Sequence, residues 1–382
     1  MCQEELVTTK AAVYFASLRA RAPYDSTVSK VGRLFDEAGF GECIGKNALT
    51  AIKLHFGEMG NDSYINPVFV REVVDRVRKC GGKPFLTDSN TLYLGSRSNA
   101  VDHIETAIRH GFDYAVAGAP LIIADGLSGG NTRSVSIDKN HFAEVIISGD
   151  IVASDSLLVL SHFKGHEVAG FGGAIKNLAM GCASARGKQE QHSARPLVIK
   201  AHCIGCGKCT VVCPKSAISL KRKKSHIDRE LCIGCFECMT VCSQHAIDID
   251  WETEIPRFVE RLVEYAFGAI QGKERRLCCM NFLTRITPDC DCVPWSDAPI
   301  VPDIGILASK DPVAIDAASF DLVNGQAAIP GSLLTRNHRK GADKFKGLRA
   351  GTDAFRQVTY GEEIGLGTSE YKLIDIQGEI EK

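Results

Sequence analysis

One motif of four cysteines occurs twice near the middle of the chain, and it restricts the possible folds more than any other feature. The first copy has the spacing C-x2-C-x2-C-x3-C, and the second copy repeats this spacing 29 positions later. The copies comprise Cys203, Cys206, Cys209 and Cys213, and Cys232, Cys235, Cys238 and Cys242. Glycines at 205, 207 and 234 allow the backbone to fold closely around a bound group. The motif predicts two centres, each held by four thiolates.

The doubled motif resembles the ligand pattern of bacterial two-cluster ferredoxins over about 50 of the 382 residues. In that family, one loop supplies three ligands of each [4Fe–4S] cluster and the other copy supplies the fourth. The resemblance implies one cluster on Cys203, Cys206, Cys209 and Cys242, and a second on Cys232, Cys235, Cys238 and Cys213. Zinc, which also binds sets of four cysteines, is the alternative.

Length and composition set the outer limits of the interpretation. A chain of 382 residues predicts two to three domains. A net charge of −1 gives no general attraction for nucleic acid. Sixteen cysteines in this order indicate metal binding in a reducing compartment rather than disulfides. Residues 1–10 lack the apolar segment of a signal peptide, and no run of 18 apolar residues occurs. We therefore expect a cytoplasmic protein without a membrane span.

Strands alternate with helices on both sides of the cysteine motifs. Strands are expected near 11–16, 48–56, 85–87, 114–117, 121–124, 143–148, 156–161, 303–308 and 371–376. Helices are expected near 26–39, 67–79, 101–110, 173 onward, 256–271 and 311–325. This alternation predicts an α/β body with a mainly parallel sheet. We expect residues 1–199 and 251–382 to form that body, and 200–250 to be an inserted α+β ferredoxin-like domain.

Polar residues in two loops are the candidates for a binding or catalytic site, because ligands of parallel sheets bind beyond the carboxyl ends of the strands. Asp88 and Arg97 lie in one such loop, where solvated loop residues are the alternative. The second loop contains His162, His166, Gly170, Gly172, Gly173 and Lys176. We predict that the histidines transfer protons and that Lys176 binds an anionic group or a covalent cofactor. The glycines predict an anion site at a helix start, and a tight packing turn is the alternative.

Further cysteines and a basic segment suggest additional binding. A third metal or redox site is a hypothesis for Cys182, His192, Cys278, Cys279, Cys290 and Cys292, with buried structural thiols as the alternative. Residues 221–224 are all basic. They could bind an acidic redox partner protein, or they could form a solvated hairpin loop.

The segment from His166 to His192 is similar to part of the lactate racemase family. His166 is followed by Gly-x-Gly-Gly-x-x-Lys, which ends at Lys176, and His192 comes 16 positions later. The resemblance implies that His166 is a proton-transfer base, that Lys176 carries a nickel-binding nucleotide cofactor, and that His192 binds nickel. The family's Gly-Thr-His-Arg segment corresponds to residues 95–98, which read Gly-Ser-Arg-Ser, so its second catalytic histidine is absent.

The chain as a whole resembles the DUF362 iron–sulfur proteins. The segments that carry this resemblance are 53–58, 161–167, 176–184, 288–292 and 302–306. The resemblance implies a fold but no assigned reaction. The sequence therefore supports the hypothesis of an iron–sulfur oxidoreductase that acts on a small anionic substrate or cofactor. The alternatives are a non-catalytic electron carrier for a partner enzyme and a maturation factor that delivers metal or clusters.

Overall fold

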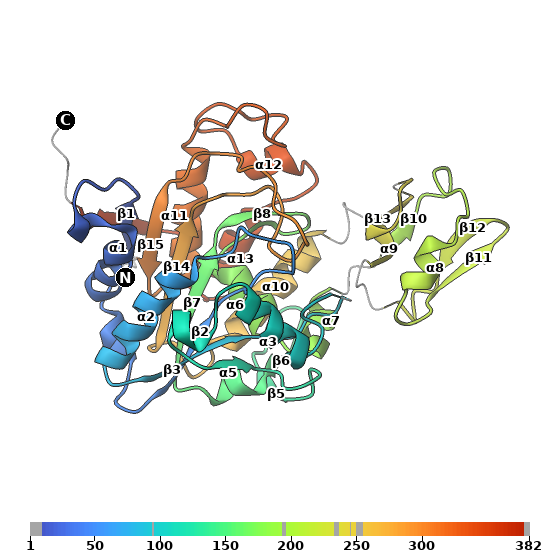
Figure 1. Ribbon diagram of the computed structural model, residues 1–382. Helices are drawn as coiled ribbons and strands as arrows, with labels where there is room; N and C mark the ends of the chain where they lie inside the picture. The colour runs from blue at the N-terminus through green and yellow to red at the C-terminus, as the bar shows by residue number, and fades with distance from the viewer. Residues whose placement is uncertain are drawn as a thin grey trace, which may run out of the picture.

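A sheet of eight strands lies at the centre of the protein (Figure 1). The structure is a computed structural model that describes residues 10–93, 95–192, 196–232, 237–244, 246–249 and 255–377. The strand order is β16-β1-β15-β14-β7-β2-β3-β4. These strands are β1 (Ala11–Ser17), β2 (Leu49–Lys53), β3 (Lys83–Asp88), β4 (Leu121–Ile123), β7 (Ser156–His162), β14 (Leu277–Leu283), β15 (Gly305–Ser309) and β16 (Tyr371–Asp375).

Most neighbouring strands of this sheet are parallel. The pairs β14–β7, β7–β2, β2–β3, β3–β4 and β1–β16 are parallel, whereas β15 is antiparallel to both β14 and β1. The predicted α/β fold with a mainly parallel sheet is confirmed. Because β2, β3, β7 and β14 run in one direction, the loops that follow them lie at the same edge of the sheet.

Helices cover both faces of the sheet, and alternate residues of each strand pack against opposite layers. Leu157 and Val159 of β7 join the core on one face, whereas Leu158 and Leu160 join the core on the other. The first face packs against α6 (Ala174–Cys182), α10 (Ile255–Ala269), α11 (Pro312–Asn324) and α13 (Arg356–Glu363). The second packs against α1 (Thr27–Glu37), α2 (Pro67–Lys79) and α3 (Ala100–Arg109).

Two expected strands differ from the structure. Residues 114–117 are a short helix, α4 (Tyr114–Ala117), because the Asp113 side chain accepts bonds from the amides of Ala115 and Val116 and so caps a helical turn. The strand expected at 143–148 exists as β6 (Glu144–Ser148), but it pairs with β5 (Thr132–Ser136) outside the main sheet. The other elements of the body are η1 (Pro23–Asp25), η2 (Phe40–Cys43), α5 (Gly149–Ala153), β8 (Lys164–His166), β9 (Gly170–Gly172), α7 (Ala185–Gln191) and α12 (Lys344–Leu348).

The segment with the repeated cysteine motif stands beside this body as a small unit (Figure 1). It contains β10 (Pro196–Val198), α8 (Lys208–Val212), β11 (Ile218–Lys221), β12 (Lys224–Ile227), α9 (Glu237–Thr240) and β13 (Ile247–Ile249). Here β10 pairs with β13, and β11 pairs with β12. The main sheet takes strands from both sides of this segment in the sequence. Within the described ranges, no helix combines the length and the apolar character needed to cross a membrane.

Candidate functional site

The carboxyl edge of the parallel strands gathers the polar residues that the sequence singled out. Asp88 ends β3 and His162 ends β7, and the loop after β14 brings residues 284–292 to the same edge. A direct contact joins these segments, because the Asp291 carboxylate lies 2.9 Å from Nδ1 of His162. The candidate site is therefore built where the parallel strands end, as expected for this class of sheet.

Buried charged side chains at this edge bind one another. Arg97 is 2% exposed, and its Nε lies 3.1 Å from Oε2 of Glu58. Its Nη1 lies 3.6 Å from Oδ2 of Asp88, whose other oxygen is 3.0 Å from Nζ of Lys53. Burial opposes ionisation of Asp88, but Lys53 and the surrounding cationic groups hold its pKa below the usual range. Asp88 and Arg97 were predicted to bind a cofactor, whereas the structure engages both in this buried network.

His162 fastens the loop after β14 to the end of β7. Its Nδ1 faces both carboxylate oxygens of Asp291 at 2.9 Å, and its Nε2 faces the carbonyl oxygens of Thr284 and Arg285 at 2.9 and 3.1 Å. All of these partners are oxygen atoms that accept hydrogen bonds, so both ring nitrogens face acceptors of the protein. Lys164 Nζ adds a contact to Asp291 at 3.1 Å. His162 therefore positions the loop, and both of its nitrogens are engaged by the protein.

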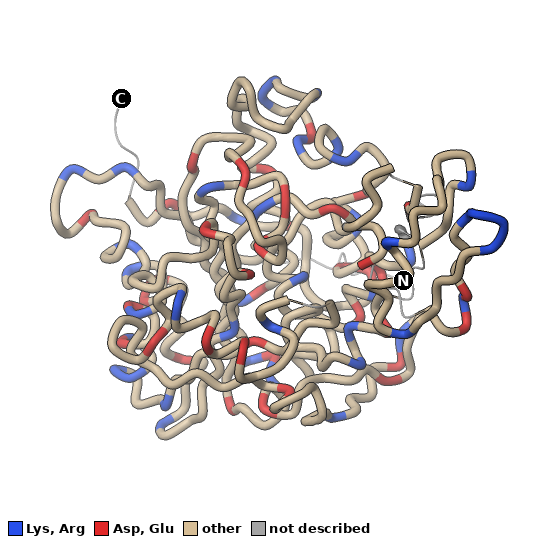
Figure 2. Tube along the Cα trace, turned by 45° about the vertical axis from the view of Figure 1, so that its right-hand side comes forward, with Lys and Arg blue, Asp and Glu red and all other residues tan. Residues whose placement is uncertain are grey.

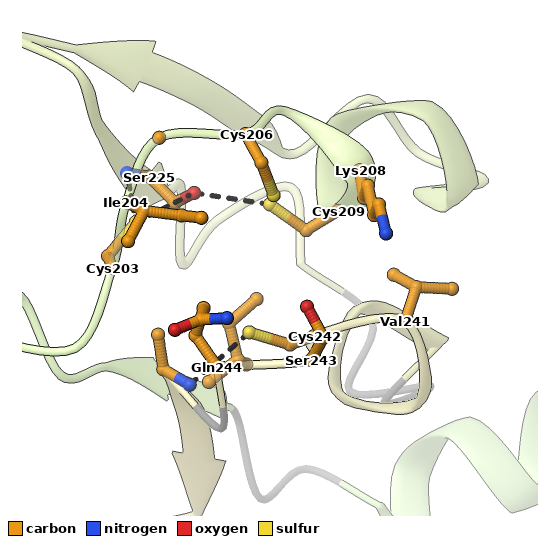
Figure 3. A pocket seen from close by; sticks show the side chains of 13 residues that line it. Cys203, Ile204, Cys206, Lys208, Cys209, Ser225, Val241, Cys242, Ser243 and Gln244 are labelled. Carbon is orange, nitrogen blue, oxygen red and sulfur yellow. Dashed lines mark hydrogen bonds between the residues drawn. The ribbon is translucent and has the colours of Figure 1, made fainter.

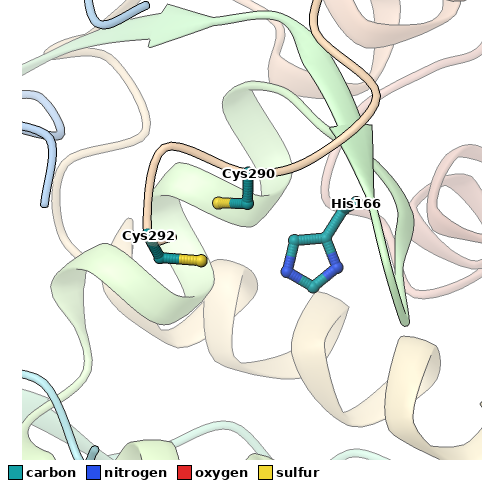
Figure 4. Close-up of side chains that lie close together, drawn as sticks. All are labelled: His166, Cys290 and Cys292. Atoms are coloured by element: carbon teal, nitrogen blue, oxygen red, sulfur yellow. The ribbon is translucent and has the colours of Figure 1, made fainter. Parts of the chain in front are cut away.

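His166, Cys290 and Cys292 form a second group at this edge (Figure 4). One ligand atom from each lies within 4.8 Å of the others, so the three side chains could hold a metal ion. Figure 4 shows the imidazole of His166 facing the two sulfur atoms, which belong to the loop after β14. His166 and Cys290 are buried, and Cys292 is half-buried. The group therefore brings His166, which was expected to transfer protons, together with Cys290 and Cys292, which were expected to belong to a third metal or redox site.

Lys176 completes this group from the first turns of α6. Its Nζ lies 3.3 Å from Sγ of Cys290. The thiol of Cys292 donates a hydrogen bond to the sulfur of Cys290. This bond, and the charges of Lys176 and Lys164, hold the pKa of Cys290 well below the usual range, although burial acts in the opposite direction. The same bond holds the pKa of the Cys292 thiol well above the usual range. The site therefore favours one thiolate, at Cys290, beside one thiol.

Hydrogen bonds fix the protonation of the His166 ring. Its Nδ1 accepts from the backbone amides of Val168 and Ala169 at 3.1 and 3.0 Å. A ring that accepts at Nδ1 carries its proton on Nε2 when it is neutral, and burial keeps it neutral by holding its pKa well below the usual range. His166 therefore presents an N–H group, at Nε2, to its surroundings. A metal-bound histidine usually does the opposite and donates its remaining N–H outward.

The glycine loop serves packing rather than anion binding at the start of α6. The amides of Ala174 and Ile175 donate to the two carboxylate oxygens of Asp316 at 2.8 and 2.9 Å. A Cβ at Gly173 would lie 2.3 Å from Oδ1 of Asp316, so glycine is required for this approach. The prediction that these amides bind a ligand anion is wrong, because a buried side chain of the protein occupies them.

The other two glycines of this loop also lie against neighbouring chain. A Cβ at Gly170 would lie 2.3 Å from the side chain of Ala354, and the φ of Gly170 is +80°. A Cβ at Gly172 would lie 3.3 Å from Cδ of Lys176 and 3.5 Å from Cε of Lys164. Gly172 thus leaves room for both lysine stems to pass into the site, whereas Gly170 permits close packing.

The remaining candidates separate into two sets. His192 ends α7 and packs on the ring of Phe258 with centroids 5.2 Å apart. Burial first, and then the charge of Lys176, lower its pKa to about 4, so His192 lies in the same region as Lys176. Cys182, Cys278 and Cys279 lie elsewhere. Cys278 and Cys279 point to opposite faces of the main sheet, and Cys182, the last residue of α6, is buried in the core on the first face.

Sequence reasoning missed the residues that hold the site together. Asp291, Lys164 and Lys53 lie in segments that carry the family resemblance but are not among the predicted site residues, and all three are buried and charged. Their positions in the sequence could have identified two of them as site residues, because Asp291 stands between two cysteines and Lys164 stands between two histidines. Charged residues in such positions are suited to orient the neighbouring side chains.

Four cysteines of the repeated motif line one pocket in the small unit (Figure 3). They are Cys203, Cys206, Cys209 and Cys242, so three come from the first copy of the motif and one comes from the second. Backbone amides of Ser225 and Ala246 donate to the sulfurs of Cys203 and Cys242 at 3.3 and 3.2 Å. Four sulfur donors around one space, with N–H groups directed at them, fit a [4Fe–4S] cluster.

The second set of four cysteines lies partly outside the described residues. Cys213, Cys232 and Cys238 are described, whereas Cys235 lies outside the described residues. Cys213 accepts a bond from the amide of Ala217 at 3.2 Å, which matches the bond from Ala246 to Cys242. The two copies therefore share this local geometry.

Comparison with known proteins places the chain in a family. Residues 50–321 match the model of a domain of unknown function, DUF362. The chain belongs to the DUF362 family. No curated protein matches its sequence. Among solved structures, it is similar to the lactate racemase apoprotein from Thermoanaerobacterium thermosaccharolyticum, with 12% identity and a TM-score of 0.37. The match covers 72% of this chain and 51% of the racemase chain, so the chain spans about half the length of that protein.

The nickel-binding nucleotide of the racemase family does not fit the site residues of this chain. Burial disfavours the charge of Lys176, but Cys290 and Cys292 outweigh burial and raise its pKa, so the lysine stays an ammonium group. Its Nζ is engaged by Cys290, and Nδ1 of His166 is engaged by backbone amides. These contacts leave neither side chain ready for the role that the resemblance implies.

Proposed function

We propose that this DUF362 protein is an iron–sulfur redox protein with two [4Fe–4S] clusters in residues 200–250, and that it is an oxidoreductase whose site is the group around His166 and Cys290. The body would then consist of residues 1–199 and 251–382. The observation that carries the proposal is the pocket lined by Cys203, Cys206, Cys209 and Cys242. Its sulfurs come from both copies of the motif, in the combination that two-cluster ferredoxins use.

The residues around the sulfurs suit this role. Each cluster, when bound, would accept or release one electron at a time. Amides of Ser225 and Ala246 direct N–H groups at sulfur, which stabilises negative charge there. The cationic side chain of Lys224 lies beside the same loop and donates to the carbonyl oxygen of Cys203. The protein therefore provides neutralising groups for a cluster that gains an electron.

A basic loop of the small unit supports docking of an acidic redox partner protein. Residues 221–224 form the tip of the β11–β12 hairpin, where Arg222 and Lys223 have positive φ values of 50° and 58°. Figure 2 shows lysine and arginine gathered at the tip of a projecting loop on this side of the protein. Such a patch speeds association with a partner of opposite charge at low ionic strength.

The group in the body supports chemistry beyond electron carriage. Lys164, Lys176 and Arg349 all act electrostatically on His166, so its surroundings are basic and attract a small anionic substrate. A simple carrier does not require a thiolate next to a buried lysine. This pairing favours the oxidoreductase over the non-catalytic carrier.

The test is metal analysis combined with two cysteine variants. Anaerobically purified protein should contain about eight iron and about eight acid-labile sulfide per chain. Cys209→Ala and Cys213→Ala should each reduce iron to about half, but they should remove different clusters, because the fourth ligand comes from the other copy. Electron paramagnetic resonance of the reduced variants distinguishes the two losses.

A matched control is Cys80→Ser, which changes a thiol outside both motifs and should leave iron unchanged. A protein that binds about two zinc ions and no iron after anaerobic reconstitution would contradict the proposal.

A further inference from the structure

Cys290 and Cys292 have the arrangement of a reactive thiol pair. They lie two positions apart on the loop after β14, and their sulfurs are within 4.8 Å of one another. Asp291, the residue between them, is fixed by His162, Lys164 and Ser63 at 2.9, 3.1 and 2.8 Å. The amide of Val293 donates to the carbonyl oxygen of Cys290 at 3.1 Å and closes a turn, and this turn, together with the anchored Asp291, brings both cysteines toward one centre.

The environment favours sulfur chemistry at this pair over a bound metal. Nδ1 of His166 accepts two backbone bonds, so Nε2 carries the proton and could bind a metal only as an anionic ring. Lys176 places an ammonium group 3.3 Å from Sγ of Cys290, where it would repel a cation. The ammonium group instead stabilises a thiolate at Cys290 by its charge.

We propose that Cys290 and Cys292 form a dithiol–disulfide redox centre that exchanges two electrons. This inference rests on the proposed function for its electron source, since two one-electron iron–sulfur carriers together supply the pair. In reduction, the bond between the two sulfurs breaks and two electrons enter. The sulfur of Cys290 becomes a thiolate beside Lys176, and the sulfur of Cys292 takes up one proton from solvent. In oxidation, the sulfur–sulfur bond forms, and two electrons and that proton leave.

The surroundings assign distinct roles to the two sulfurs. Cys290 is 1% exposed and touches Lys176, so it is suited to remain the buried thiolate. Cys292 is half-buried, so its sulfur can meet solvent or a substrate. Half-buried Glu167 is adjacent in sequence to His166 and acts electrostatically on Cys292. We assign to its carboxylate the role of exchanging this proton with solvent.

The experiment uses the full chain, purified anaerobically with its iron, in buffers of dithiothreitol that range from reduced to oxidised. Free thiols are alkylated with one reagent, disulfides are then reduced, and the released thiols receive a second reagent of different mass. Trypsin yields the peptide 286–310, whose two cysteines are Cys290 and Cys292. We expect this peptide to carry either two first labels or two second labels, because both sulfurs change state together.

Two variants sharpen the test. Lys176→Met should slow alkylation of Cys290 at neutral pH by about tenfold or more, because less thiolate is present. Cys290→Ser should abolish the second label at Cys292, whereas Cys80→Ser, the control, should retain it. Thiol reactivity and label state are read directly, so the result does not depend on knowing the substrate.

The outcomes separate this inference from the proposed function. Paired labelling in protein that lacks iron supports the redox pair and contradicts the iron–sulfur proposal. Full iron content with peptide 286–310 reduced in every buffer overturns the redox pair alone. One zinc ion per chain that is lost in Cys290→Ser and blocks alkylation in the parent would also overturn it. A mixed peptide with one label of each kind would show independent thiols and equally refute the pair.

Discussion

Replacing Arg97 with methionine keeps much of the apolar length of the side chain and removes its charge. Arg97 is 2% exposed, and its guanidinium contacts Glu58 at 3.1 Å and Asp88 at 3.6 Å. Both carboxylates are themselves almost fully buried. After the substitution, Asp88 retains Lys53, whereas Glu58 has no cationic partner left among the described residues and keeps hydrogen bonds from Tyr93 and from the backbone and hydroxyl of Ser96.

The expected loss follows from leaving one buried carboxylate without its ion-pair partner. Breaking a buried pair by removing one charge costs about 3–5 kcal/mol. For a chain of 382 residues, the entropy of unfolding is about 0.8 kcal/mol per degree, so 4 kcal/mol corresponds to a fall in Tm of about 5 °C. Such a loss is a large part of the stability of an ordinary protein, which is about 5–15 kcal/mol.

The assay is urea and thermal unfolding of the anaerobic protein, followed by far-ultraviolet circular dichroism. The matched control is Arg109→Met, which breaks an ion pair with Glu105 in which the side chains are 61% and 56% exposed. Exposed pairs contribute about 0–1 kcal/mol, so the control should unfold almost as the parent does. The double variant Arg97→Met/Glu58→Gln should recover part of the loss, because it removes the unpaired charge as well.

The pH dependence supplies an independent check. Cations near Asp88 hold its pKa below the usual range, so its contribution to stability is present above about pH 4 and is lost as the pH falls further. Arg97→Met removes one of those cations, so the difference between parent and variant should narrow below about pH 4. A variant as stable as the parent at pH 7 would refute the structural role of Arg97 and return this residue to the ligand-binding candidates.

Three further predictions concern the glycine loop, a buried acid and the small unit. Gly173→Ala should lower the free energy of unfolding in urea by about 1–3 kcal/mol, because the added Cβ would lie 2.3 Å from Asp316. The control is Gly130→Ala, whose added Cβ would have no atom within 4 Å and should change this free energy little. Burial raises the pKa of Asp316 to about 6. The free energy of unfolding of the parent should therefore fall by up to about 3 kcal/mol, relative to that of Asp316→Asn, as the pH rises from 4 to 7. A difference between the two proteins that does not change with pH would contradict this. Removing residues 200–250 and joining the ends should leave a body with the circular dichroism of a folded α/β protein, because none of the strands described in this segment belongs to the main sheet. An unfolded product would contradict the insertion.

The sequence allowed the sheet to be predicted because its strands and caps carry local signals. Asn66 and Pro67 mark the start of α2, and Asp311 and Pro312 mark the start of α11, as side-chain caps and first-turn prolines should. The four-residue helix at Tyr114 was mistaken for a strand, because an apolar run of that length has no measurable period. Its cap, Asp113, was the signal that could have corrected this.

The candidate site was harder to predict because its contacts join distant parts of the chain. Asp316 reaches the start of α6 from 142 positions away, and nothing local to Gly173 reveals that a carboxylate already fills the anion position. The pairing of Lys176 with Cys290 spans 114 positions. Spacing within one segment can therefore identify which side chains have reactive chemistry, but it cannot identify their partners.

The same distinction separates the two cysteine sites of this protein. In the small unit, the spacing of the motif specifies both the ligands and their grouping, because all of the donors lie within 40 residues of one another. In the body, Cys290 and Cys292 acquire their chemistry from a lysine on α6, a histidine on β8 and an aspartate anchored by β7. A change in any of these three elements should alter the reactivity of the thiols while leaving iron content unchanged. Reactivity at Cys290 is therefore the measurement that reports on the body independently of the clusters.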